Sequence, residues 1–293
     1  MSNLDLTDPI DPISAIEVDG VEIPLAGSGG SNLDTQEFEK AIDDYSNLFV
    51  PYSGIYSRIL EKNSWDTIGY ISSEISANNY TAEQVAEIYG WNIGDTKEFQ
   101  TLSGETCVAR IIDFNHDIDE YNRVVGITFE TRDVLAATYA MNDAANVTGG
   151  YAQCMFRTSN LPTIIDTMPL DLLRNAKLVK KLFADGDSKT ATKIDYRYDK
   201  LFIPAAVEIG LGSDSNIYDY AGEGSTYKFY ADGGSKVKQK YGIPENFAWF
   251  TRTATNGGSI MSSMKYYVSV TTSGGKGKTT PTTKAGICLM FCI

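Results

Sequence analysis

Four cysteines and one histidine are the side chains of this chain best suited to metal or redox chemistry. A structural zinc site draws on paired C-x-x-C or H-x-x-x-H spacings, and neither spacing occurs in the sequence. Free cysteine is among the most buried residue types, so four small buried side chains are favoured over metal or redox chemistry. On a strand, the last two cysteines point to one face together with Met290. The residues concerned are Cys107, Cys154, Cys288, Cys292 and His116.

The histidine stands in the stretch IIDFNHDID, among Asp113, Asp117 and Asp119. Such a group could bind a cation or take part in acid–base catalysis. The spacing lacks the central glycine and the distal glutamate of a calcium-binding loop. We therefore expect His116 to be a turn residue whose ring is hydrogen-bonded by a neighbouring carboxylate.

The stretch GGKGKTT, residues 274–280, invites comparison with a phosphate-binding loop. That loop needs a glycine at position 272 and a helix after the lysine. Position 272 is Thr and Pro281 follows, so we expect residues 271–284 to form an exposed basic loop between two final strands. No nucleophile motif or cofactor fingerprint occurs in the sequence. Among 38 acidic residues some close carboxylate pairs are expected in any case, so they do not indicate a glycoside hydrolase. The sequence predicts a protein that is not an enzyme and binds no cofactor or metal ion.

The whole chain has a net charge of -13, and its acidic excess lies in the first third. Residues 1–100 hold 18 acidic and 4 basic side chains, whereas residues 101–293 hold 20 acidic and 21 basic side chains. This asymmetry suggests two regions with different roles, and an acidic face that only keeps the chain soluble is an equally good interpretation. A protein that binds nucleic acid would carry the opposite charge, so that class is disfavoured.

Hydrophobic residues make up 42% of the chain, which is enough to form a core. The longest apolar run, residues 286–293, is far shorter than the roughly 18 to 20 residues that cross a bilayer. We therefore expect no membrane insertion. The N-terminal sequence MSNLDLTDPIDP has neither the basic nor the apolar region of a secretion signal, so synthesis in a cytoplasm is expected.

Three regions are predicted along the chain. Residues 1–34 are interpreted as an extended arm and linker, because two Asp-Pro pairs disfavour helix and AGSGGSN is flexible; IEVDGVEI predicts two short strands within it. Residues 35–63 are predicted to be a helical connector, with a helix from Asp34 or Thr35 through Ser46. Residues 64–293 are predicted to form the head domain.

Within the head, TAEQVAEIYG predicts a helix with Thr81 as N-cap, Gln84 completing a capping box and Gly90 ending it. A hairpin is predicted about Ser103-Gly104, followed by a strand at VVGITFE. Other segments are predicted from periodicity and breakers, and the order of all elements gives an α+β fold. The other predicted segments are helices at 132–142 and 166–183, the latter interrupted at Pro169, and strands at 200–210, 246–253, 265–271 and 286–293.

Tyrosines cluster in the loop-rich C-terminal end, which suits a recognition surface, although ordinary packing explains them equally well. Residues 228–284 carry nine Lys or Arg against two Asp or Glu, so a ligand bound there would be acidic or a polar glycan. The candidate ligand-binding residues are Tyr218, Tyr220, Lys276 and Lys278.

Several blocks, in their order and spacing, resemble a widespread uncharacterised domain of bacteriophage and gut-Firmicutes proteins. Members of that family show G-G-W-x-x-S-x-M-R, D-K-L-F-L-L-S, W-W-L-R-S and terminal G-V-x-x-G-F-C-I blocks. This chain departs from them at Tyr151, Cys154, Phe250 and Thr251. The matching blocks are GGYAQCMFR (149–157), DKLFIPAAVEI (199–209), EGSTYKFY (223–230), AWFTRT (248–253) and AGICLMFCI (285–293).

The resemblance implies structural roles for four matching positions: Arg157, Trp249, Arg252 and Gly286. The two arginines are expected to anchor buried hydrogen-bond networks. The pattern is also similar to C-type-lectin-like domains, in which a late W-x-R strand and a terminal apolar strand pair inside the core. This implies that KAGICLMFCI is a closing central strand.

The resemblance further implies a non-enzymatic structural protein of a bacteriophage virion, such as a head fibre, tail fibre, spike or decoration protein. It would attach to other virion proteins and oligomerise through residues 1–63, at the virion surface, after synthesis in the host cytoplasm. The lectin-like head would be available for adhesion to a host surface glycan. Two alternatives are a bacterial surface or secreted carbohydrate-binding module, and a formylglycine-forming type of oxidase, which needs a reactive cysteine pair.

Overall fold

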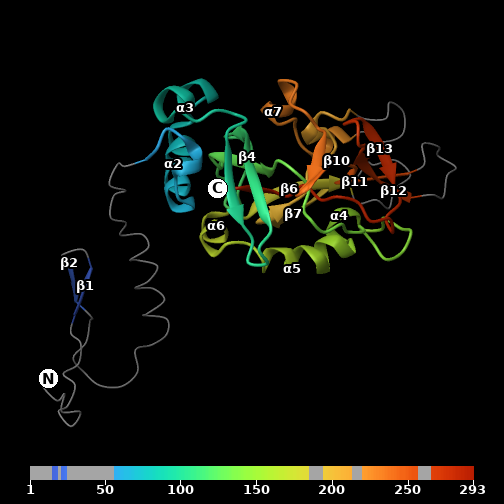
Figure 1. Ribbon diagram of the computed structural model, residues 1–293, viewed down its shortest axis with the longest axis horizontal. Helices are drawn as coiled ribbons and strands as arrows, with labels where there is room; N and C mark the ends of the chain where they lie inside the picture. Colours follow the sequence, from blue (N-terminus) through green and yellow to red (C-terminus); the bar gives the residue numbers. More distant parts are fainter. Residues whose placement is uncertain (1–14, 19–20, 25–55, 185–193, 213–219, 257–264) are drawn as a thin grey trace, which may run out of the picture. The chain divides into compact units, whose positions relative to one another are not determined.

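The computed structural model divides the chain into two units, residues 1–54 and residues 55–293, which we describe separately. The second unit begins at residue 55, upstream of the head boundary expected at 64. Residues of the expected connector belong to this unit, because Leu60 is buried in its core and the Trp91 indole N–H donates to the Ser57 carbonyl oxygen at 3.0 Å. The described residues are 15–18, 21–24, 56–184, 194–212, 220–256 and 265–293 (Figure 1).

In the N-terminal unit, β1 (Ala15–Val18) and β2 (Val21–Pro24) form the antiparallel pair that IEVDGVEI predicts. Their register places Ile16 opposite Ile23 and Glu17 opposite Glu22. The predicted helix through Ser46 lies outside the described residues.

The C-terminal unit mixes helices and antiparallel strands, which confirms the predicted α+β class. Its α-helices are α2 (Trp65–Asn78), α3 (Ala82–Tyr89), α4 (Gly150–Gln153), α5 (Leu161–Ile165), α6 (Leu170–Asn175) and α7 (Lys228–Ala231). Shorter turns of helix are the 3-10 segments η1 (Leu60–Lys62), η3 (Val207–Ile209) and η4 (Tyr220–Glu223) and the π-type segment η2 (Phe156–Asn160). The strands are β3 (Thr96–Gln100), β4 (Thr106–Phe114), β5 (Ile127–Thr131), β6 (Val179–Ala184), β7 (Ile194–Asp199), β8 (Leu201–Phe202), β9 (Lys238–Lys240), β10 (Ile243–Phe247), β11 (Trp249–Asn256), β12 (Lys265–Val270), β13 (Lys276–Thr279) and β14 (Met290–Cys292).

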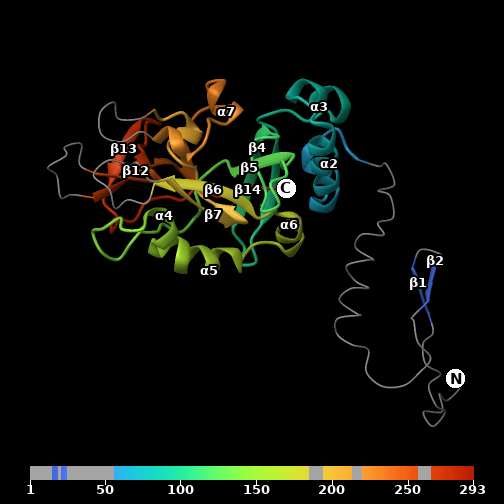
Figure 2. The same ribbon diagram turned by 180° about the vertical axis from the view of Figure 1, so that it is seen from behind.

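The terminal apolar run ends in the short strand β14, at the interior of the largest sheet (Figure 2). The strand order is β3-β4-β5-β14-β8, and β14 is antiparallel to both of its neighbours. Phe291 pairs with Phe129 on one side and with Leu201 on the other. A closing central strand is therefore present, but it covers Met290–Cys292 and not the whole predicted range 286–293.

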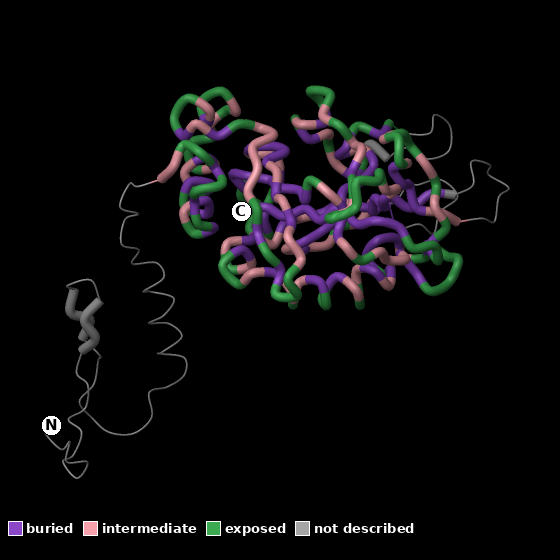
Figure 3. Tube along the Cα trace, in the orientation of Figure 1, coloured by how far each residue is buried: buried purple, intermediate pink, exposed green. Residues whose placement is uncertain are grey.

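Hydrophobic clusters cover both faces of this sheet, and buried residues fill the interior of the unit (Figure 3). On one face, the Phe129 and Phe291 rings stack with centroids 5.3 Å apart, and Trp65 of α2 packs edge-on against both. On the other face lie Met290 and Cys292 of β14, together with side chains of the smaller sheets. Burial on both faces explains why the run is apolar without alternation. The smaller sheets are β6-β7, β10-β9 and β11-β12-β13.

Local signals predicted helix α3 correctly. Thr81 accepts from the Gln84 N–H, and the Gln84 side chain accepts from the Thr81 N–H, so the capping box is formed. Gly90 ends the helix with a left-handed φ of 77°. The hairpin about residues 103–104 is likewise present as β3 and β4.

Two helix predictions were wrong. Residues 132–142 are irregular, because their main-chain groups bond distant segments: the Val134 N–H donates to Gln239 and the Leu135 N–H to Ile287. Of 166–183, only α6 is helical within the predicted limits, and 179–184 form strand β6. Short apolar runs do not distinguish a buried helix from a buried strand, and tertiary pairing decided both cases. The expected basic loop 271–284 also contains a strand, β13.

Candidate functional site

The most unusual chemistry of the C-terminal unit is a group of five buried ionisable residues, which we name the central ionic cluster. Lys181 lies on the inward face of β6 and Arg252 on β11, while Glu208 belongs to η3 and Glu223 to η4. Asp117 follows the end of β4. All five are less than 10% exposed, and Glu223 and Arg252 are fully buried. Charges are almost never buried without partners, so their contacts determine what this site does.

Glu208 is the centre of the cluster. Its carboxylate accepts two hydrogen bonds from the Arg252 guanidinium, at 2.6 and 2.7 Å, and forms an ion pair with the Lys181 ammonium at 2.7 Å. Burial would raise the pKa of Glu208, but Arg252 and Lys181 lower it below the usual value. Lys181 also contacts Asp117 at 2.7 Å and the Tyr227 hydroxyl at 2.9 Å. These contacts join β6, β11 and η3 through charge-assisted hydrogen bonds.

The remaining N–H groups of Arg252 donate to main-chain oxygens of three different segments. The acceptors are Leu182 at 2.7 Å, Ile203 at 2.9 Å and Glu223 at 3.0 Å. With the two bonds to Glu208, all five guanidinium N–H donors have partners. Arg252 is therefore a structural anchor between strands and short helices.

Glu223 differs from the other carboxyl groups of the cluster, because its carboxyl oxygens contact neutral donors. It accepts from the Ala184 N–H at 2.8 Å and contacts the Thr253 hydroxyl, whereas Arg252 bonds its main-chain oxygen. The cluster holds three carboxyl groups and two permanent cations, so one carboxyl group is left without a cation of its own. Burial raises the pKa of Glu223 to about 7. Of the three carboxyl groups of the cluster, Glu223 is thus the one that loses its proton at the highest pH.

A second buried ionic group surrounds Glu130 of β5. Its carboxylate accepts from Arg110 at 3.0 Å, from Lys238 at 3.0 Å and from the Tyr230 hydroxyl at 2.6 Å. Burial alone would raise the pKa of Glu130, but Lys238 and Arg110 lower it. The Lys238 ammonium also donates to the main-chain oxygens of Thr131 and Arg132. This group ties β9 and α7 to the large sheet.

His116 has the partner that the sequence suggested. Its Nδ1 lies 2.7 Å from an Asp113 carboxylate oxygen, and its ring packs against Tyr227 with centroids 4.3 Å apart. Asp117 faces Lys181, and Asp119 accepts from the Arg123 guanidinium, so the neighbouring carboxylates point to different partners. Among the described residues, no group of three or more potential ligands is arranged to hold a metal ion.

The four cysteines are free and buried, as expected from the sequence. Burial raises the pKa of Cys107, Cys154 and Cys288 to about 12, and that of Cys292 well above its ordinary value. Such thiols are almost entirely protonated and react slowly.

We therefore predict that the native chain reacts with a thiol reagent such as DTNB only as fast as it unfolds, whereas all four thiols react at once in guanidinium chloride. Rapid modification of one thiol in the native chain, measured by absorbance and peptide mapping, would contradict this.

Of the four candidate ligand-binding residues, the structure describes the side chains of Lys276 and Lys278. Tyr218 lies outside the described residues, as does the side chain of Tyr220, which begins η4. Lys276 and Lys278 are exposed neighbours on β13, and the Lys276 ammonium donates to the Gly212 carbonyl at 3.0 Å.

The positions shared with the family blocks make structural contacts. Arg157 donates two hydrogen bonds to the Asp199 carboxylate, at 3.0 and 2.7 Å. The buried Trp249 donates its indole N–H to the Lys236 carbonyl at 3.0 Å. At Gly286, a Cβ atom would lie 2.9 Å from the Val134 side chain, so a larger residue would push this segment away.

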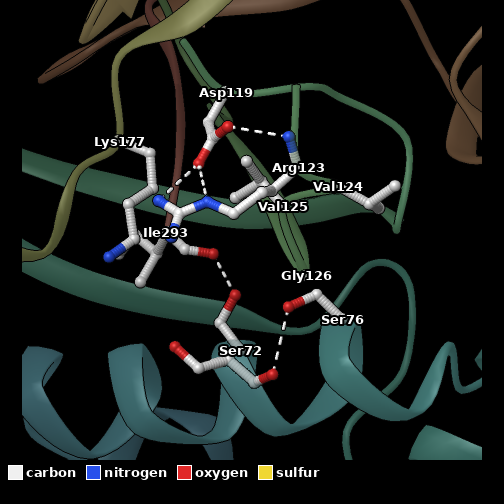
Figure 4. A pocket seen from close by; sticks show the side chains of 10 residues that line it. Ser72, Ser76, Asp119, Arg123, Val124, Val125, Gly126, Lys177 and Ile293 are labelled. Carbon is white, nitrogen blue, oxygen red and sulfur yellow. Dashed lines mark hydrogen bonds and ion pairs between the residues drawn. The ribbon is translucent and has the colours of Figure 1, made fainter. Parts of the chain in front are cut away.

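A pocket of about 190 Å³ lies between α2 and residues 119–126 (Figure 4). On its floor, the Ser72 hydroxyl donates to the main-chain oxygen of Ile293. The Ser73 and Ser76 hydroxyls donate to main-chain oxygens of their own helix. Because these hydroxyl protons are already engaged, the observed contacts connect α2 to the end of β14 and define no ligand.

Sequence reasoning named Asp117 only as a neighbour of His116, and it missed the other acidic members and the lysines of both ionic groups. The available signal was alternation: in VKKLF, residues 179–183, Lys181 lies between the buried Val179 and Phe183 at strand spacing. Because the segment was interpreted as a helix, that alternation was not recognised.

Tyr151 is fully buried, and its hydroxyl has no hydrogen-bond partner. A buried hydroxyl without a partner costs free energy. We predict that Tyr151→Phe leaves the free energy of unfolding unchanged or raises it by up to about 1 kcal/mol. Urea denaturation measures this, and a loss larger than about 1 kcal/mol would show that the hydroxyl has a stabilising partner.

Comparison of the chain with protein-family models, curated proteins and solved structures gave no match. The described helices include none that is long and apolar enough to span a membrane.

Proposed function

We propose that this chain is a non-enzymatic structural protein of a bacteriophage virion, in which the N-terminal unit attaches to the particle and the C-terminal unit is displayed at its surface. The proposal rests on the resemblance of the ordered blocks between residues 149 and 293. It includes a lectin-like arrangement of the C-terminal unit and adhesion to a host glycan as its use.

The different roles proposed for the two units, attachment and display, rest on their different charge. Residues 1–54 hold 11 acidic side chains and one basic side chain, so they carry most of the net charge of -13. A segment with such an excess of acidic side chains is suited to binding a partner of opposite charge. Basic surfaces on a virion partner would supply the complementary charge.

The chemistry of the C-terminal unit supports a display role over the oxidase alternative. Its buried charges are used to join strands and helices, as Arg252 and Glu130 illustrate. An oxidase of the formylglycine-forming type needs thiols that ionise readily, whereas burial raises the pKa of Cys288 to about 12.

The test is to locate the protein in particles. Particles released from a culture of the source bacterium would be purified by density gradient and labelled with gold-conjugated antibody against residues 55–293. We expect label on the particle surface. Label confined to the cell envelope or to the particle-free medium would contradict the proposal and favour the carbohydrate-binding module.

A further inference from the structure

The two-stranded sheet β6-β7 leaves an unusual surface toward solvent. Its inward residues include the charged Lys181, whereas aromatic and aliphatic side chains project outward. Tyr196 is 44% exposed, and its ring contacts Tyr198 edge-on and the Lys180 ammonium at 4.4 Å. Ile118, which pairs beside β6, is 43% exposed. Exposed apolar side chains of this kind mark interaction sites.

Strand β7 is also an open edge. It pairs with β6 on one side, and no strand of the described chain pairs with its other side. The Tyr196 N–H donates to the Asp195 carboxylate at 2.8 Å, and the Tyr196 carbonyl accepts from the Arg197 guanidinium at 2.6 Å. Flanking side chains thus bond the main-chain groups that a neighbouring strand would otherwise bond.

The sequence of this edge is complementary to itself. Asp195 and Arg197 flank Tyr196 symmetrically, with opposite charges. If two such strands run antiparallel about a twofold axis at Tyr196, Asp195 of each copy lies opposite Arg197 of the other. Opposite charges at directly facing positions stabilise a strand pair, and a twofold interface requires this kind of self-complementarity.

We propose that β7 pairs with β7 of a second copy of this chain about Tyr196, so that β6 and β7 of two copies form one continuous antiparallel sheet. The Tyr196 main-chain groups of the two copies then bond each other, and Asp195 and Arg197 exchange their present contact for one across the interface. This pairing is independent of attachment by the N-terminal unit and holds whether or not the protein belongs to a virion.

The test is position-specific crosslinking in the full-length protein. Cross-strand partners at a twofold axis have Cα atoms about 5.5 Å apart, within the range that a disulfide spans. We expect Tyr196→Cys to form a covalent dimer under mild oxidation, because the four native thiols are buried. Tyr241→Cys, at a residue that is 50% exposed between β9 and β10, is the matched control and should give several-fold less dimer.

Charge variants in the Tyr196→Cys background make the test sharper. Arg197→Asp places two pairs of like charges across the axis and should reduce dimer formation by roughly tenfold. The double variant Asp195→Arg with Arg197→Asp restores opposite charges and should restore the dimer. Both side chains are 41% exposed, so the exchange should not disturb folding. Equal crosslinking of the two cysteine variants, or no recovery in the double variant, would overturn the proposal.

Discussion

Replacement of Arg252 by methionine is expected to lower the free energy of unfolding by about 3 to 5 kcal/mol, because it leaves a buried carboxylate without its main partner. In the intact chain Arg252 bonds Glu208 twice and three main-chain oxygens besides. Methionine fills similar space but satisfies none of these acceptors. Urea denaturation followed by circular dichroism measures the change.

Two controls keep this prediction specific. Arg174→Met removes an exposed ion pair with Asp66, whose side chains are 67% and 55% exposed, and should cost at most about 1 kcal/mol. Arg252→Lys keeps the charge but loses the planar fork, so it should fall between the wild type and methionine. If Arg252→Met and Arg174→Met proved equally stable, the central ionic cluster would not hold the fold together.

The second large effect is a dependence of stability on pH that disappears in Glu223→Gln. The pKa of Glu223 is raised from 4.5 to about 7 in the folded chain, so the folded state binds the proton more tightly than the unfolded state. This contribution is fully present below pH 4.5 and is lost as the pH rises to about 7. A shift of this size corresponds to about 3 kcal/mol.

Other groups act in different pH ranges. Hydrogen bonding to Asp113 opposes burial and raises the pKa of His116, so its contribution is lost as the pH rises above 6.5. Against the effect of burial, Lys181 lowers the pKa of Asp117, and Arg252 with Lys181 lowers that of Glu208, so the contributions of both carboxylates are lost at acid pH. We therefore expect the slope between pH 4.5 and 7 to flatten in Glu223→Gln, measured by denaturation in a buffer series. An unchanged slope would show that Glu223 is ionised in the folded chain.

The elements that the sequence predicted correctly are those with local physical signals. Helix α3 has its capping box at Thr81 and its left-handed glycine at Gly90, both within a few residues. The apolar run that ends in β14 could only be buried in a core, because it is too short for a membrane. These features depend little on the rest of the chain.

Features that depend on distant contacts could not be predicted in this way. Residues 132–142 resemble a helix but bond Gln239 and Ile287, more than a hundred residues away. The central ionic cluster joins side chains from Asp117 to Arg252, and no single stretch of sequence reveals that Lys181 and Glu208 meet. Only Arg252 was expected to anchor a buried network, through the resemblance, and Asp117 was named only beside His116. Pairing at such sequence separation is decided by tertiary structure.

The measurement that tests the proposed function most directly is a sedimentation assay with purified particles from which the native protein has been stripped. The full chain and a chain beginning at Ile55 would be mixed with particles at equal concentration, and the pelleted fraction measured. The account predicts that the full chain sediments with the particles while residues 55–293, still folded by circular dichroism, stay in the supernatant. Equal sedimentation of both chains, or of neither, would contradict attachment through the N-terminal unit.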